Sequence, residues 1–251
     1  MDLHGKTALV TGGARRVGRA IGHELAKAGA NVVVHCRLSR AAAEATCAAV
    51  RACSVGAAVV VGDLGSAGDV SRIADEAEAA FGAIDVLVNN ASTFFHTPIE
   101  TLNADTWDRV LSVNLKGPFL LAVRLGRAMR DRGGGVIVNI GDWAGLRPYR
   151  GYLPYCVSKA GIVALTSGLA KALAPEVRVN CVAPGPVLPP EDYTAAERAQ
   201  LTQLTPLKRL GSPEDVARMV RFLVTEADFC TGGVYLVDGG RLNAQGTPPR
   251  D

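Results

Sequence analysis

Short runs of apolar, mostly β-branched residues alternate along the chain with longer, alanine-rich stretches. The apolar runs predict strands: Thr7–Val10, Asn31–His35, Ala57–Val61, Ile84–Val88, Gly135–Ile140, Arg178–Val182 and Val234–Val237. The intervening stretches predict helices over Gly18–Ala28, Arg40–Arg51, Ser66–Phe81, Asp105–Arg130, Pro154–Ala174 and Pro213–Thr225. This alternation is typical of an α/β fold in which helices cover both faces of a parallel sheet.

Three segments interrupt the pattern. Gly117-Pro118 lies inside the fourth predicted helix and is expected to kink or split it. The segment 184–212 contains five prolines and is predicted to be an irregular lid or substrate loop. The tail 244–251 is expected to be frayed.

Composition narrows the class of protein. A chain of 251 residues with 48% hydrophobic and 20% charged residues predicts one globular domain over 1–251. The net charge is only +3 and the arginines are scattered, so neither nucleic acid nor an anionic membrane is indicated as a partner. No signal peptide and no apolar run long enough to cross a bilayer is recognised, which predicts a cytoplasmic protein. The six cysteines show no CxxC pair and no metal-ligand spacing, so they are expected to be reduced and no metal site is predicted.

The first predicted strand runs into TGGARRVGRAIGHEL. A turn of small residues between strand and helix lets the backbone approach a pyrophosphate, whose charge the helix N-terminus favours, although such turns also occur for geometric reasons alone. The second predicted strand is followed by Cys36 and then by Arg37, Ser39 and Arg40, where an NAD site would place a carboxylate. These residues suit the 2′-phosphate of NADP(H); the alternative is a solvated helix start.

Further candidates follow the later strands. Asp63 could accept a hydrogen bond from an adenine amino group, or could simply belong to a helix N-cap region. Asn89-Asn90-Ala91-Ser92 ends a strand at the edge where an open sheet binds ligands. Tyr155 and Lys159 stand four residues apart and therefore share a helix face, where the ammonium is expected to lower the phenol pKa.

Together these motifs resemble the short-chain dehydrogenase/reductase family. The matching residues are Thr11-Gly12 to Gly18, Asn89-Asn90-Ala91, Asn114, Tyr155 with Lys159, and Pro184-Gly185. The resemblance covers nearly the whole chain and implies a single Rossmann-like doubly wound sheet, a nicotinamide cofactor and a homotetramer. It also implies that Lys159 binds the nicotinamide ribose and that Asn114 holds a water that relays protons to it.

Two departures resemble the pteridine reductase branch. Arg16 replaces the middle glycine of the turn, and Asp142 replaces the usual catalytic serine. By this similarity Phe94 sandwiches a pterin against the nicotinamide, with core packing as the alternative. An ionised carboxylate at position 142 would repel the oxyanion of a reduced ketone but suits a substrate with N–H donors. Otherwise Asp142 is a loop carboxylate facing solvent.

The sequence therefore predicts an NADPH-dependent reductase of a dihydropterin or dihydrofolate C=N bond. The alternatives are a carbonyl reductase of the 3-oxoacyl or quinone type that has lost its serine, and a catalytically silent NADP(H)-binding regulator. Asp142, Tyr155, Lys159 and Asn114 are the candidate catalytic residues, and Arg16, Phe94, Asp142, Tyr155 and Leu188 would contact substrate. The candidate cofactor-binding residues are Gly12, Arg15, Arg16, Val17, Gly18, His35, Arg37, Ser39, Asp63, Leu64, Asn90, Ala91, Ser92, Tyr155, Lys159, Pro184 and Gly185.

Overall fold

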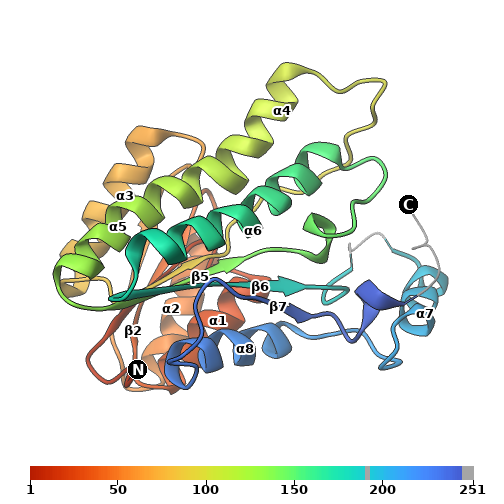
Figure 1. Ribbon diagram of the computed structural model, residues 1–251. Helices are drawn as coiled ribbons and strands as arrows, with labels where there is room; N and C mark the ends of the chain where they lie inside the picture. The colour runs from red at the N-terminus through yellow and green to blue at the C-terminus, as the bar shows by residue number, and fades with distance from the viewer. Residues whose placement is uncertain (190–192, 245–251) are drawn as a thin grey trace.

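The computed structural model describes residues 1–189 and 193–244, in which one parallel sheet is covered by helices (Figure 1). Over these residues the sheet has seven strands in the order β3-β2-β1-β4-β5-β6-β7. They are β1 (Thr7–Val10), β2 (Asn31–Cys36), β3 (Ala57–Val61), β4 (Val86–Asn89), β5 (Gly135–Ile140), β6 (Val177–Pro184) and β7 (Val234–Val237). The predicted fold class, a single Rossmann-like doubly wound α/β sheet, is confirmed.

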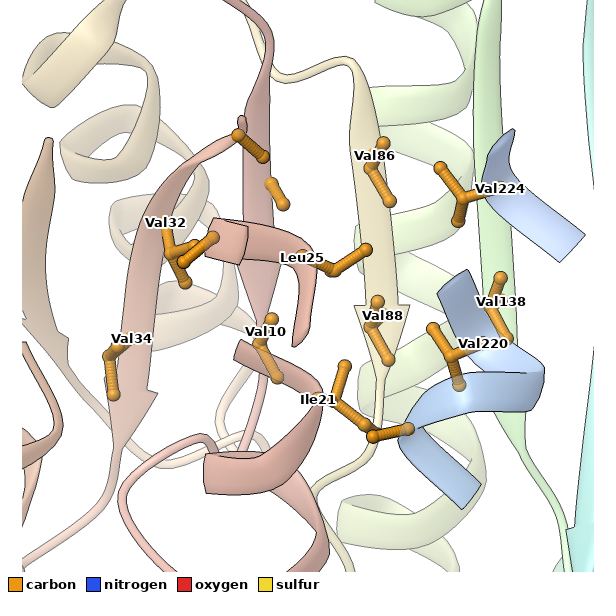
Figure 2. Close-up of a cluster of buried hydrophobic side chains, with 14 of the residues drawn as sticks. Val10, Ile21, Leu25, Val32, Val34, Val86, Val88, Val138, Val220 and Val224 are labelled. Carbon is orange, nitrogen blue, oxygen red and sulfur yellow. The ribbon is translucent and has the colours of Figure 1, made fainter. Parts of the chain in front are cut away.

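Two layers of helices bury the two faces of the sheet. One core cluster joins the sheet to α1 (Arg16–Lys27), α2 (Arg40–Arg51) and α8 (Pro213–Thr225). In Figure 2, Ile21 and Leu25 of α1 and Val220 and Val224 of α8 point toward valines of the central strands. The second cluster joins the other face to α3 (Ala67–Phe81), α5 (Gly117–Asp131) and α6 (Leu153–Leu173). Burial on both faces explains why the strands read as continuous apolar runs.

The fourth predicted helix is divided, as expected, but by a π-helical turn rather than a break. α4 (Ala104–Leu111) continues through the π-helix η1 (Ser112–Lys116) into α5, and Pro118 lies in the first turn of α5. Proline has no N–H, so it cannot donate to the carbonyl of Asn114 four residues earlier. The π-turn thus coincides with a candidate site residue, a frequent association for such turns.

The segment 184–212 was predicted to be irregular, and this is wrong in part. It contains the helix α7 (Ala195–Leu204), which Figure 1 shows beyond the carboxyl ends of the strands. The helix begins with a capping box, because Thr194 Oγ1 accepts from Glu197 N and the Glu197 carboxylate accepts from Thr194 N. The tail from residue 245 lies outside the described residues.

A second expectation fails at α6. This helix is long and apolar enough, by length and composition, to cross a membrane, with a mean hydropathy of 1.3 over its most apolar stretch. The sequence was expected to contain no such run. The composition has another explanation in this fold, because α6 packs between the sheet and α4 and carries Tyr155 and Lys159.

Candidate active site

Two adjoining cavities of about 480 Å³ and 350 Å³ open at the carboxyl ends of the strands. The first lies beside the β1–α1 turn, where the strand order reverses between β1 and β4. Ligands of open α/β sheets bind at this switch point. Both cavities share part of their lining: Arg16, Val17, Asn90 and Ser92. A ligand that passes from one cavity to the other therefore crosses the side chains of the turn.

The turn itself requires glycine at two positions. Gly12 has φ +62°, and a Cβ there would come within 2.9 Å of Ala91 Cα. A Cβ on Gly18 would come within 2.3 Å of the Gly12 carbonyl oxygen. Arg16 also has a positive φ of 51°, a conformation that glycine adopts at lower cost. The backbone at Arg16 is therefore more strained than it would be with glycine at this position.

The NNA motif holds this turn in place. Thr11 Oγ1 accepts hydrogen bonds from the backbone N–H groups of Asn90 (2.9 Å) and Ala91 (3.0 Å). The Asn90 side chain donates to the carbonyls of Thr11 (2.8 Å) and Gly12 (3.2 Å). Asn90 thus shapes the cofactor turn as well as lining the cavity.

The His35 imidazole holds the β1–α1 turn through a hydrogen bond to its backbone. Its Nδ1 accepts from Gly12 N (3.2 Å) and its Nε2 donates to the Gly62 carbonyl (3.0 Å), which defines a neutral tautomer. Burial lowers the pKa of this buried imidazole, so the ring stays uncharged at neutral pH. The imidazole therefore supports the turn through hydrogen bonds and not through a charge.

The first cavity is lined by cationic side chains and only one carboxylate, Asp63. The Arg37 guanidinium lies 3.5 Å from Asp63 Oδ2, with both side chains nearly half exposed, so the pair is weak and Arg37 can turn toward a phosphate. Ser39, predicted to contact the same phosphate, lines neither cavity and instead occupies the N-cap position of α2. The cations are Arg15, Arg16, Arg37 and Arg109. The close backbone approach at the glycines and this charge fit a dinucleotide that carries an additional phosphate.

Most predicted cofactor residues meet in this first cavity: Gly12, Arg15, Arg16, Val17, Gly18, His35, Arg37, Asp63, Leu64, Asn90, Ala91 and Ser92. Tyr155, Lys159, Pro184 and Gly185 line the second cavity instead. The sequence analysis missed Gly62, Thr93, Arg109 and Val113. Arg109 lies on α4. No local motif in the sequence indicates which face of this helix is directed toward the cavity.

Asp142 is the polar centre of the second cavity. It follows β5 and caps the 3₁₀-helix η2 (Trp143–Gly145), where its Oδ1 accepts from Ala144 N at 2.7 Å. Tyr155 OH donates to Asp142 Oδ2 at 2.8 Å, and Tyr149 OH donates to Oδ1 at 2.9 Å. A solvent-facing loop carboxylate is thereby excluded. Of these three donors, Oδ2 has the Tyr155 hydroxyl and Oδ1 has the other two.

Gly145 allows η2, which Asp142 caps, to pack closely against α6, which carries Tyr155. A Cβ at Gly145 would come within 2.7 Å of the Lys159 carbonyl carbon, so η2 lies directly against α6 only because this residue has no side chain. The contact fixes the strand-end carboxylate relative to the helix face that carries the Tyr155 hydroxyl.

Burial and neighbouring charges shift the pKa values of Asp142, Tyr149 and Tyr155. Burial raises the pKa of Asp142, against the opposing effects of the Ala144 N–H, the Lys159 ammonium and the two phenols. Burial and the Asp142 charge raise the pKa of Tyr155 and Tyr149 well above the ordinary value. The expectation that Lys159 lowers the Tyr155 pKa is therefore wrong for this arrangement. Tyr155 is a neutral donor here because the nearest charge to its hydroxyl is a carboxylate.

The Lys159 ammonium lies over the ring of Tyr155. Its Nζ donates to the Ile140 carbonyl at 2.9 Å and lies 5.6 Å from the centroid of the Tyr155 ring. Burial lowers the pKa of this lysine, while the Asp142 charge acts in the opposite direction. The ammonium thus faces the end of β5, at the floor of the cavity.

The Asn114 side chain joins three segments of the site. Its side-chain carbonyl accepts from Thr93 N (2.8 Å), and its amide donates to Thr93 O (3.0 Å) and Ser158 Oγ (3.2 Å). The side chain is thus occupied in joining η1 to α6 and to the segment before Phe94. The water that Asn114 is expected to hold for a proton relay to Lys159 stays a prediction.

Phe94 lies in the second cavity and is 46% exposed, which excludes the alternative of core packing. Its ring stacks on Tyr152 (4.5 Å between centroids, 1° between planes) and meets the edge of Tyr155 at 4.7 Å. Across the cavity mouth, Arg16 Nη2 donates to the Leu188 carbonyl at 3.0 Å. The stacked rings give the cavity a flat aromatic wall, suited to a planar ligand ring.

Several residues of the second cavity were missed: Tyr149, Tyr152, Pro186, Val187, Pro189, Tyr193 and Leu201. Tyr152 could have been found, because it precedes Tyr155 by three residues at the start of the same helix. Pro189, Tyr193 and Leu201 come from the segment predicted to form a substrate loop.

Comparison with known proteins identifies the family. A family model described as enoyl-(acyl carrier protein) reductase matches residues 12–241. The chain belongs to the short-chain dehydrogenase/reductase family. Members of this family are oxidoreductases, and the chain is accordingly one.

Individual short-chain dehydrogenase/reductases differ in the reactions that their names describe. The 3-oxoacyl-(acyl-carrier-protein) reductase of Synechocystis sp. is 37% identical, covering 96% of this chain and 98% of the relative. The structure of FolM alternative dihydrofolate reductase 1 from Brucella canis, complexed with NADP, is 38% identical with a TM-score of 0.87 and covers 97% of this chain and 96% of that one. A 7α-hydroxysteroid dehydrogenase complexed with NADH and a 7-oxo bile acid is 30% identical with a TM-score of 0.92, over 99% and 97%. Overall similarity thus leaves the substrate to be argued from the site.

Proposed function

We propose that the protein is an NADPH-dependent reductase of the pteridine reductase type, which reduces a C=N bond of a dihydropterin or dihydrofolate. The observation that carries this proposal is the Asp142 carboxylate, which takes the place of a hydroxyl donor and accepts from both phenols. The 38% identity to an alternative dihydrofolate reductase supports it. The cationic first cavity and the NADP in that relative support the choice of cofactor.

The residues divide the chemistry between binding and proton transfer. Bound NADPH would supply the hydride to the ring carbon of the C=N bond. Tyr155 donates its hydroxyl proton to the neighbouring nitrogen, which gains the electron pair of the broken π bond, and the phenolate then takes a proton from solvent. The Asp142 carboxylate accepts from amino or ring N–H groups of the substrate, and Phe94 supports the planar ring.

The second candidate is a carbonyl reductase, favoured by the 37% identity to a 3-oxoacyl reductase. Its oxyanion would develop beside Asp142, and an ionised carboxylate there opposes the charge that such a reaction must stabilise. The third candidate, a silent NADP(H)-binding regulator, gives no reason for the hydrogen-bonded Asp142–Tyr155 pair. NADPH oxidation with dihydropterins, quinones and oxoacyl thioesters distinguishes all three.

Asp142→Ser separates the two enzymatic candidates. For a pteridine reductase we expect the kcat/KM for dihydropterin to fall by about 10²–10³, because the acceptor for substrate N–H groups is lost. For a carbonyl reductase the same change should raise the kcat/KM for the oxoacyl substrate, because the repulsion of the oxyanion is removed. The measurement is kcat/KM of parent and variant on both substrates. Equal values for the two proteins on dihydropterin would contradict the proposed function.

A further inference from the structure

Tyr149 contacts the reactive carboxylate without belonging to any motif of the family pattern described above. Its hydroxyl donates to Asp142 Oδ1 at 2.9 Å, while Tyr155 donates to Oδ2 at 2.8 Å. The two phenols thus bind opposite oxygens of one carboxylate. Tyr155 comes from α6, whereas Tyr149 comes from the loop between η2 and α6.

The Tyr149 ring is held on several sides. It lies 5.3 Å from the Trp143 ring and packs edge-on to Tyr152 at 6.3 Å. Its backbone N–H donates to Cys156 Sγ at 3.2 Å. Because ring and backbone are both anchored, the hydroxyl is directed at Asp142 before any substrate arrives, and this preorganisation lowers the entropy cost of the contact.

Rotation of the Asp142 carboxylate is the motion that these contacts oppose. Oδ1 has two donors on separate segments, Ala144 N and Tyr149 OH, so the carboxylate plane is fixed from that side. Oδ2 is then the oxygen that meets Tyr155 and the substrate position. We propose that Tyr149 is a positioning residue that holds Asp142 by Oδ1 in the orientation from which Oδ2 works with Tyr155.

The same hydrogen bond affects the charge of Asp142. The groups that face the carboxyl are the Tyr155 phenol and Lys159 ammonium of α6, the Tyr149 phenol of the loop and the Ala144 N–H of η2; Arg16 lines the same cavity from α1. The Tyr149 hydrogen bond lowers the pKa of Asp142 and so opposes the rise caused by burial. Its removal should move the titration of Asp142 to higher pH.

Tyr149→Phe keeps the ring and removes only the hydroxyl. In the proposed reaction, on which this kinetic test rests, Asp142 acts as the ionised acceptor. We expect kcat/KM for dihydropterin at the parent's optimum to fall about 10-fold, the size of one hydrogen bond to a charged group. The acidic limb of its pH profile should move to higher pH, because the hydrogen bond that lowers the pKa of Asp142 is lost. NADPH affinity should be unchanged. A pH profile parallel to the parent's would overturn the proposal.

Stability provides a readout that needs no substrate. Because the folded pKa of Asp142 is raised, the stability from its protonated form is present below the unfolded pKa of about 4 and is lost as pH rises through the folded pKa. Parent and variant share the unfolded pKa, and the Tyr149 hydrogen bond is strongest to the charged carboxylate. The Tm deficit of Tyr149→Phe should therefore widen as pH rises through the folded pKa of Asp142. In an Asp142→Asn background this deficit should not depend on pH.

Tyr235→Phe is the matched control, since Tyr235 is a partly buried tyrosine of β7 that lines neither cavity. Its Tm difference from the parent should not depend on Asp142. A pH-independent deficit for Tyr149→Phe would reduce Tyr149 to a packing residue and overturn the proposal. If the parent reduces no dihydropterin, the proposed function fails. The stability measurement still tests whether the Tyr149 hydroxyl holds the Asp142 carboxylate.

Discussion

At the residue scale, burial and three hydrogen bonds act in opposite directions on the protonation of Asp142. Burial favours the neutral acid, whereas two phenols and a backbone amide favour the anion. The phenols respond in turn, because the nearby carboxylate raises the pKa of each above its ordinary value. Both phenols therefore keep their protons at neutral pH. The Tyr155 proton is then available to a reaction that adds a hydride and a proton to its substrate.

Tyr155→Phe tests whether this proton reaches the substrate through Tyr155. The change removes the donor to Asp142 Oδ2 but leaves the first cavity, which Tyr155 does not line, intact. We expect kcat to fall by about 10²–10⁴, the usual contribution of a general acid, with little change in the NADPH Kd. Stopped-flow hydride transfer and equilibrium titration with NADPH measure the two quantities. Retention of most of the activity would assign the general acid to another group.

Sequence reasoning found Tyr155 and Lys159 because helical spacing places them on one face and the accompanying motifs give that spacing its meaning. Tyr149 was missed because its approach to Asp142 depends on the path of a loop, which no periodicity predicts. The predicted effect of Lys159 on the Tyr155 pKa was wrong for a related reason. Spacing placed the lysine near the ring, but only the three-dimensional path shows that the carboxylate, and not the ammonium, meets the hydroxyl.

At the scale of elements, the site depends on the contact between η2 and α6. Gly145 allows that contact because its missing Cβ leaves room for the backbone of Lys159. The strands that carry the loops were predictable, since burial on both faces requires continuous apolar runs. Helix α7 was not predicted, because the prolines before and after it dominate the local pattern; the Thr194–Glu197 capping box was the available signal.

Gly145→Ala should separate these two elements. The new Cβ would lie 2.7 Å from the Lys159 carbonyl carbon, so η2 must shift at a cost of about 1–3 kcal/mol, which corresponds to a fall in Tm of roughly 2–12 °C. We expect turnover to fall more than NADPH affinity, because Asp142 moves relative to Tyr155. Differential scanning calorimetry and kcat measure these effects.

Gly168→Ala is the control within α6. No atom lies within 4 Å of its added Cβ, so alanine should only improve helix propensity and raise stability by about 0.5–1 kcal/mol. Its turnover should equal that of the parent. A Gly145→Ala protein with unchanged Tm and kcat would show that the loop accommodates the methyl group and that the η2–α6 contact does not position Asp142.

At the scale of the whole molecule, one sheet edge collects both cavities. The turn after β1, the NNA segment after β4, Asp142 after β5 and Pro184 at the end of β6 all lie there, because parallel strands end at the same edge. This convergence was predictable from the order of motifs. The division of the residues between two cavities was not, since it depends on side-chain packing. The homotetramer stays a prediction.

Binding of the correct cofactor should stabilise the whole fold. A ligand that binds only the folded state at one hundred times its Kd adds about 2.7 kcal/mol, or roughly 5–10 °C in Tm for a chain of this size. We expect NADPH to raise Tm more than NADH at equal concentration, because Arg37 and its cationic neighbours line the cavity in which we expect the additional phosphate to bind. Arg37→Asp should abolish the difference, as one charge-assisted contact is worth about 1.5–3 kcal/mol.

Arg40→Asp changes the net charge equally, but Arg40 does not line the cavity and lies near Glu44, so this variant should keep the preference. Equal shifts with NADPH and NADH in the parent would contradict the assignment of the phosphate site, whereas equal losses in both variants would indicate a diffuse effect of charge rather than a contact made by Arg37.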